Sequence, residues 1–140
     1  MKRFYSATAS IILLLAAAPV LAQSAQAIKR TVKKDAKTMI SVHSNAFKPS
    51  PGTFSCVQGG PITIEITDPP KNGTVTLRPA TEKNPNCTNE LTGTGIFYRP
   101  RPGYTGTDTF SYNRTDQGVG EVQKATGPQG LRTVTIEVRS

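Results

Sequence analysis

The chain has 140 residues and a formal net charge of +8, with 17 Lys and Arg residues against nine Asp and Glu residues. This length fits one domain, or two at most, and the basic excess favours anionic partners. Two Cys residues and a single His are too few ligands, at no recognisable spacing, for a metal centre, so neither a metal nor another cofactor is expected.

Residues 1–27 have the organisation of a secretory signal peptide. A charged beginning, "MKR", precedes an apolar run from Ile11 to Ala18, which is far shorter than the ~20 residues needed to span a bilayer. Small residues then offer two cleavage sites, after Ala22 ("VLA") and after Ala27 ("AQA"), and we prefer the second. The protein is therefore expected to be exported, either to the periplasm or out of the cell, without a transmembrane segment.

The next segment, residues 28–37, is strongly basic. It contains five cations and one acid and shows no clear hydrophobic period, so we expect a mobile arm. Near an anionic surface each cation contributes ~1 kcal/mol of binding free energy. The arm thus supplies candidate contacts to an anionic polymer or membrane surface of the cell envelope: Lys29, Arg30, Lys33, Lys34 and Lys37. A solubilising segment with no binding role is the alternative interpretation.

From Thr38 onward the hydrophobic pattern has a period of two. Apolar β-branched or aromatic residues alternate with polar ones in "TMISVH", "PITIEIT", "GTVTLR", "GIFYRP" (with Phe97 as its apolar residue), "TDTFSYN" and "RTVTIEVR". Turn sequences rich in Gly, Pro, Asn and Asp separate these runs, and no window has a convincing helical period. The pattern predicts that residues 38–140 form one all-β domain, an antiparallel β-sandwich of about seven short strands.

His43 is the only histidine. The alternation in "TMISVH" directs Ile40 and Val42 to the core and His43, with Met39 and Ser41, to the solvent. A catalytic Ser–His pair also needs an orienting group and an oxyanion site, which the sequence does not place. We therefore expect a surface histidine, no catalytic residues and no enzymatic activity.

Cys56 and Cys87 are expected to form a disulfide, because an even number of Cys residues in an exported protein favours pairing. Closing a loop of roughly 30 residues would stabilise the fold by about 3–4 kcal/mol in the chain-entropy model. Cys87 would also restrain a long loop from Pro79 to Thr94. A loop held on a rigid scaffold is a candidate for recognition, and a purely structural loop is the other interpretation.

The stretch "RPGYTGTDTFSY" predicts a corner of the sandwich. Tyr104 lies between two breaks in the chain, where its ring can pack on the sandwich edge and its hydroxyl can bond to nearby backbone, as in a tyrosine corner. Asp108 is positioned to accept backbone N–H bonds in the same turn. Phe110 and Tyr112 then begin a strand with their side chains in the core.

The runs "NGTVTL", "FYRPRPGYTGTDTFSY" and "TVTIEV" together resemble the bacterial Ig-like and cadherin-like repeat domains of secreted and surface proteins. The resemblance extends from about Pro61 to Val138. It implies an Ig-like sandwich used outside the cytoplasm as a spacer, adhesion or binding module without catalysis. This chain departs from the family pattern by its single copy, basic balance and Cys pair. Its isolated acids do not support the calcium sites that some such repeats contain.

These features predict a non-catalytic, exported Ig-like module for binding or adhesion at the cell envelope. Its expected partner is an anionic envelope polymer or a protein, and not a nucleic acid. The alternative is a small accessory or inhibitor-type protein that docks a specific protein partner through its loops or a sheet edge.

Overall fold

The computed structural model describes residues 26–47, 50, 52, 55–85, 87–116 and 130–140, and these residues form strands and turns without a helix. The predicted signal peptide lies outside them except for its last two residues. The strands are β1 (Gln26–Lys33), β2 (Thr38–His43), β3 (Ala46–Phe47), β4 (Val57–Gln58), β5 (Ile62–Asp68), β6 (Gly73–Glu82), β7 (Leu91–Pro100), β8 (Gly106–Asp116) and β9 (Gly130–Arg139).

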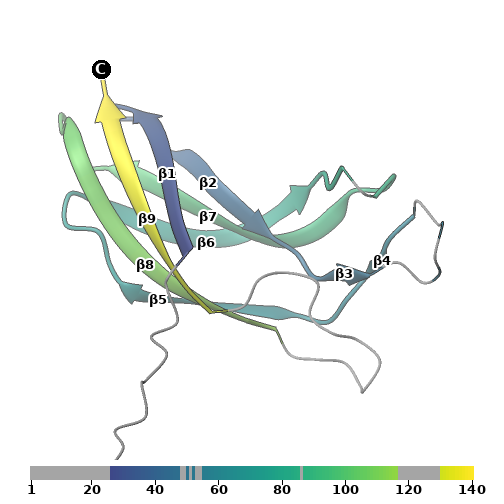
Figure 1. The fold of residues 1–140 in the computed structure, drawn as a ribbon. Helices are drawn as coiled ribbons and strands as arrows, with labels where there is room; N and C mark the ends of the chain where they lie inside the picture. Colours follow the sequence, from purple (N-terminus) through teal and green to yellow (C-terminus); the bar gives the residue numbers. More distant parts are fainter. Residues whose placement is uncertain (1–25, 48–49, 51, 53–54, 86, 117–129) are drawn as a thin grey trace, which may run out of the picture.

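Two sheets packed face to face make up the domain (Figure 1). One has four strands in the order β1-β9-β8-β5, and the other has three in the order β2-β7-β6, while β3 and β4 pair as a separate short ribbon. Neighbouring strands are antiparallel except for β1 and β9, which are parallel. The predicted all-β sandwich is therefore confirmed.

The core lies between the two sheets and follows the predicted alternation in most strands. On β9, Val134, Ile136 and Val138 are buried, and on β8 Phe110 and Tyr112 are fully enclosed. The main cluster consists of Val32, Ile40, Ile64, Ile96, Tyr98, Phe110, Tyr112, Val134, Ile136 and Val138. On β7 the inward residues are Ile96 and Tyr98, and Phe97 therefore faces outward.

The predicted mobile arm is wrong for most of its length, because residues up to Lys33 belong to β1. The strand pairs with β9 along its whole length, from Gln26 opposite Arg132 to Lys33 opposite Arg139. Val32 is buried in the core and Ile28 packs against it. Arg30 lies between these two apolar residues, at a position where the alternation would require a third apolar residue. The period of two is therefore not recognisable in the sequence of β1. Gln26 and Ala27, the last two residues before the preferred cleavage site, already pair with Arg132 and Thr133 of β9.

The prediction that His43 points to the solvent is wrong, because β2 contains a β-bulge. The register with β7 shifts between Met39 and Ser41, so that Ser41 lies opposite the buried Ile96 and His43 lies opposite Thr94. Residues opposite each other in an antiparallel pair share a face, so the bulge directs Ser41 and His43 inward. Val42, which was expected to point inward, faces outward for the same reason.

The predicted Cys56–Cys87 disulfide is present, with the two Cα atoms 5.4 Å apart. It joins the β3–β4 ribbon to the connection between β6 and β7 at one end of the sandwich, away from the C-terminus (Figure 1). Ala46, Cys56 and Leu91 form a small buried cluster there, separate from the main core. The end of the molecule is therefore held by its own packing and one covalent bond.

The predicted long loop is shorter than expected. Pro79 and Thr94 are not loop residues but a cross-strand pair, and β6 and β7 stay paired as far as Glu82 and Leu91. Sequence inspection ended the strand early because Pro is rare inside strands, but β6 is an edge strand, where Pro is tolerated. The connection is limited to residues 83–90.

Candidate functional site

Asp108 joins both sheets and a distant turn. Its buried carboxylate accepts hydrogen bonds from the backbone N–H groups of Lys71 (3.1 Å), Asn72 (2.9 Å) and Thr109 (3.0 Å), and from the Tyr98 hydroxyl (2.9 Å). Two of these backbone donors lie in the β5–β6 turn rather than in the turn of Asp108 itself. Gly73 is needed beside them, since a Cβ at this position would come within 2.5 Å of the Tyr98 ring. Asp108 is thus a structural anchor, not a solvent-exposed acid available for chemistry.

Burial, together with the hydrogen bond to Asp108, raises the pKa of Tyr98 well above its ordinary value of 10.0. A raised folded-state pKa stabilises the protein fully below the pKa of the unfolded chain, and this stabilisation is lost as the pH rises toward the folded value. We therefore expect the free energy of unfolding to fall above about pH 10. In Tyr98→Phe this decline should be shallower by up to about 1.4 kcal/mol per pH unit. Urea unfolding between pH 8 and pH 11.5 measures both slopes, and equal slopes would contradict the assignment.

Tyr104 closes the same corner from outside the core. Its hydroxyl donates a 2.7 Å hydrogen bond to the carbonyl of Thr107, and the Arg101 guanidinium lies 5.2 Å from its ring centroid. Gly106 follows with φ = 125°, a backbone conformation that favours glycine. The aromatic residues of this stretch thus have structural contacts, with Tyr104 on the corner and Phe110 and Tyr112 in the core.

His43 takes part in a polar contact between the sheets. Its Nε2 atom is 2.7 Å from the Tyr112 hydroxyl and 3.3 Å from Ser41 Oγ, and its Nδ1 atom is 3.4 Å from an Arg114 nitrogen. Arg114 also donates to the carbonyl of Ser44 at 3.0 Å. Desolvation raises the pKa of Tyr112, while Arg132 and Arg114 act in the opposite direction. Both imidazole nitrogens are engaged with neighbours, an arrangement that links β2 to β8.

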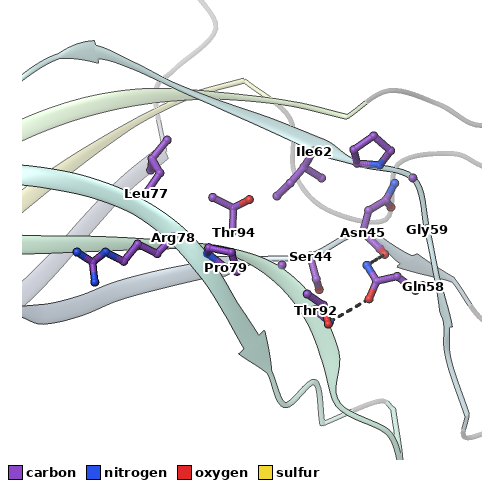
Figure 2. A pocket seen from close by; sticks show the side chains of 13 residues that line it. Ser44, Asn45, Gln58, Gly59, Ile62, Leu77, Arg78, Pro79, Thr92 and Thr94 are labelled. Carbon is purple, nitrogen blue, oxygen red and sulfur yellow. Dashed lines mark hydrogen bonds between the residues drawn. The ribbon is translucent and has the colours of Figure 1, made fainter.

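An open cleft of about 380 Å³ lies where the sheets splay apart near the start of β5. Figure 2 shows Leu77 and Pro79 on one side of it and Ile62 on the other, with Asn45 and Gln58 at one end. The Gln58 side chain donates to the Asn45 carbonyl and accepts from the backbone N–H of Thr92, at 3.1 and 3.0 Å. The cleft is lined mainly by apolar groups and backbone, and its volume is near the lower limit for ligand sites.

The five cations of the predicted arm do not form one surface. Lys29 and Lys33 lie opposite Thr135 and Arg139 of β9, on the outer face of the four-stranded sheet. The Arg30 side chain instead donates to the carbonyl of Ile40 at 3.1 Å. Lys34 follows β1 in the turn. Lys37 directly precedes β2 of the other sheet, and its ammonium group lies 5.4 Å from the centroid of the Phe97 ring.

Lys37 belongs to a surface that sequence inspection missed. On the outer side of the three-stranded sheet, cations from three separate segments surround one aromatic ring. We call this surface the basic face and define it by Lys37, Met39, Thr76, Arg78, Phe97 and Arg99. The outward alternation of "GTVTLR" could have indicated Arg78, but only the pairing of β2, β7 and β6 brings these side chains together.

The basic face brings three cations together. Two other cations of the described surface instead pair with acids, in Lys83–Glu90 and Arg139–Glu137. Desolvation of the Lys37 ammonium, and the nearby charges of Arg78 and Arg99, lower the pKa of Lys37. Since mutual repulsion of cations favours the binding of anions, this surface is the strongest candidate for a binding site.

Among the described residues, no group of three or more His, Cys, Asp or Glu side chains could hold a metal ion, and no helix is long and apolar enough to cross a membrane. No family model, curated protein or solved structure matches this chain.

Proposed function

We propose that this protein is an exported, non-catalytic binding module of the Ig-like type that acts at the cell envelope. The observation that carries this proposal is the basic face, on which Lys37, Arg78 and Arg99 lie around Phe97. A concentration of cations on a rigid sheet attracts anionic surfaces and increases association rates. Envelope components are the main anionic material that an exported protein meets.

The order of the strands supports the Ig-like assignment. In that fold the second, fifth and fourth strands form one sheet, and the third, sixth and seventh form the other. Without the β3–β4 ribbon, the two sheets of this chain have that order, with β1 beside β9 at the edge of the second sheet. The disulfide is placed differently from the inter-sheet bond of antibody domains, because it joins two connections at one end of the sandwich.

A non-catalytic role agrees with the surroundings of the titratable groups. The nitrogens of His43 contact Tyr112, Ser41 and Arg114, and the carboxylate of Asp108 accepts four hydrogen bonds. Export is supported by the apolar segment near the N-terminus and by the Cys56–Cys87 bond, which suits an oxidising compartment.

The test is fractionation of cells that express the full chain, followed by cosedimentation of the processed protein with isolated envelopes across a salt series. We expect the protein in the exported fraction, bound to envelopes at low salt and released at high salt, because screening weakens exposed charge interactions. A protein that stays in the cytoplasm, or that does not bind envelopes at low salt, would contradict the proposal.

The alternative is a small accessory protein that docks a specific protein partner, and the cleft beside Leu77 is the observation that favours it. Leu77 is 39% exposed, which is unusual for an apolar side chain directed between two sheets. Docking by strand addition is less favoured, because each sheet edge has a protective feature: cations on β1, bulges in β2 and β5, and Pro79 in β6. Binding that resists moderate salt would support this alternative.

A further inference from the structure

The side chains of the basic face form a regular grid. Met39, Phe97 and Thr76 lie side by side across the three strands, since Phe97 pairs with both of the others. Arg99 lies on one side of this row, two residues along β7. Arg78 lies on the other side, two residues along β6 and opposite Gly95. Cations therefore flank the aromatic ring in both directions along the strands.

The grid is also free of carboxylates over its described positions. On β6 the outward residues after Arg78 are Ala80 and then Glu82, which is four residues or ~13 Å further along the strand. Glu82 accepts a 2.6 Å hydrogen bond from the Ser44 hydroxyl. The nearest acid after Arg78 on this face of β6 is thus distant from Arg78, so no carboxylate at the described grid positions competes with an anion for the three cations.

The ring of Phe97 lies flat rather than projecting from the sheet. A Cβ atom added to Gly95 would come within 2.8 Å of Phe97 Cε2, which shows that the ring covers this glycine. Phe97 is only partly exposed, and Lys37 approaches its face. The exposed Lys37 side chain can turn away from the ring toward an anionic substituent, and the flat, supported ring then offers a platform for the C–H face of a sugar ring.

We propose that the basic face binds an acidic polysaccharide, with Phe97 stacking on a sugar ring and Lys37, Arg78 and Arg99 holding its anionic substituents. This inference rests on the proposed function and names the ligand class for the same surface. A polymer suits the grid because its charges repeat along a chain, and cations on adjacent strands lie within a few residue spacings of one another. A flat sheet face can accept an extended polymer without a deep pocket.

The experiment measures binding of the processed, disulfide-bonded protein to alginate and dextran sulfate. Neutral dextran and phosphatidylglycerol vesicles are parallel probes. The test variant is Lys37→Gln/Arg78→Gln/Arg99→Gln, and its matched control is Lys29→Gln/Lys33→Gln/Lys34→Gln, which removes three charges from the edge of the other sheet. Phe97→Leu keeps an apolar cover over Gly95 but removes the aromatic face. Thermal unfolding checks that each variant is folded.

We expect the test variant to bind the acidic polymers about 100-fold more weakly, since each cation near an anionic surface contributes roughly fivefold in affinity. The control should change the affinity by less than about threefold, and Phe97→Leu should weaken binding about fivefold. Neutral dextran should not bind.

Equal losses in the test and control variants, or tighter binding to vesicles than to polymers, would overturn the proposal. If the test variant still binds envelopes as the natural chain does, the ligand assignment fails while the proposed function stands; if the natural chain itself does not bind envelopes, the proposed function fails.

Discussion

Asp108→Asn is expected to destabilise the protein by about 3–5 kcal/mol, a large part of the free energy of unfolding of a domain this small. Each carboxylate oxygen of Asp108 accepts two hydrogen bonds, one pair from Lys71 and Thr109 and the other from Asn72 and Tyr98. An amide presents N–H donors where one of these oxygens lies. The donors on that side would then lose their acceptor, and the amide would face them with hydrogens of its own. The midpoint of urea unfolding measures the loss.

Two variants make this result specific to the anchor. Asp68→Asn replaces an exposed carboxylate on β5, and we expect a change within about 0.5 kcal/mol. Tyr98→Phe removes a single donor from Asp108 and should cost about 1–2 kcal/mol at neutral pH. The anchor role would be refuted if Asp108→Asn and Asp68→Asn had the same midpoint.

Removal of the disulfide by Cys56→Ala/Cys87→Ala is expected to cost about 3–4 kcal/mol, given a sequence separation of 31 between the two residues. The effect should be concentrated at one end of the molecule. Ala46, Cys56 and Leu91 form a cluster of their own, and the main core between the sheets contains neither cysteine. Hydrogen exchange should show lost protection in residues 55–58 and 83–92, with β8 and β9 retaining theirs.

Asn89→Ala is the matched control for the disulfide. The Asn89 side chain accepts from the Cys56 backbone N–H and donates to the Cys56 carbonyl, both at 2.9 Å, so it links the same two segments without a covalent bond. Its loss should cost about 1–2 kcal/mol and leave the end of the molecule ordered. Uniform loss of protection across β8 and β9 in the double Cys variant would instead show that the bond supports the whole fold.

The strands were predictable wherever one local rule applied. In β9, Val134, Ile136 and Val138 alternate with polar residues, and the buried positions follow from the sequence directly. The same rule failed in β2, because the extra residue of the bulge turns every later side chain to the opposite face of the sheet. The amino-acid composition of the strand does not indicate the bulge. It also failed in β1, where Arg30 occupies a position between two apolar residues and reaches the Ile40 carbonyl at the sheet edge.

The candidate site was less accessible to sequence inspection than the fold. Five cations close together in the sequence suggested a single binding arm, but three of them lie in β1 and only Lys37 lies on the basic face. Arg78 and Arg99 come from strands far away in the chain and are adjacent only because β6 pairs with β7. Proximity in sequence is a poor guide to proximity on a sheet, since neighbouring strands bring distant segments within about 5 Å.

By itself, the sequence determined the sandwich architecture, the Cys56–Cys87 pairing and the burial of Phe110 and Tyr112. These properties depend on side-chain polarity alternating along one strand, on turn residues, and on an even number of cysteines. The tertiary structure alone decided which donors Asp108 accepts from, where His43 points and which cations share a surface. Each of these depends on strand register and sheet order, which arise from contacts between segments that no local pattern encodes.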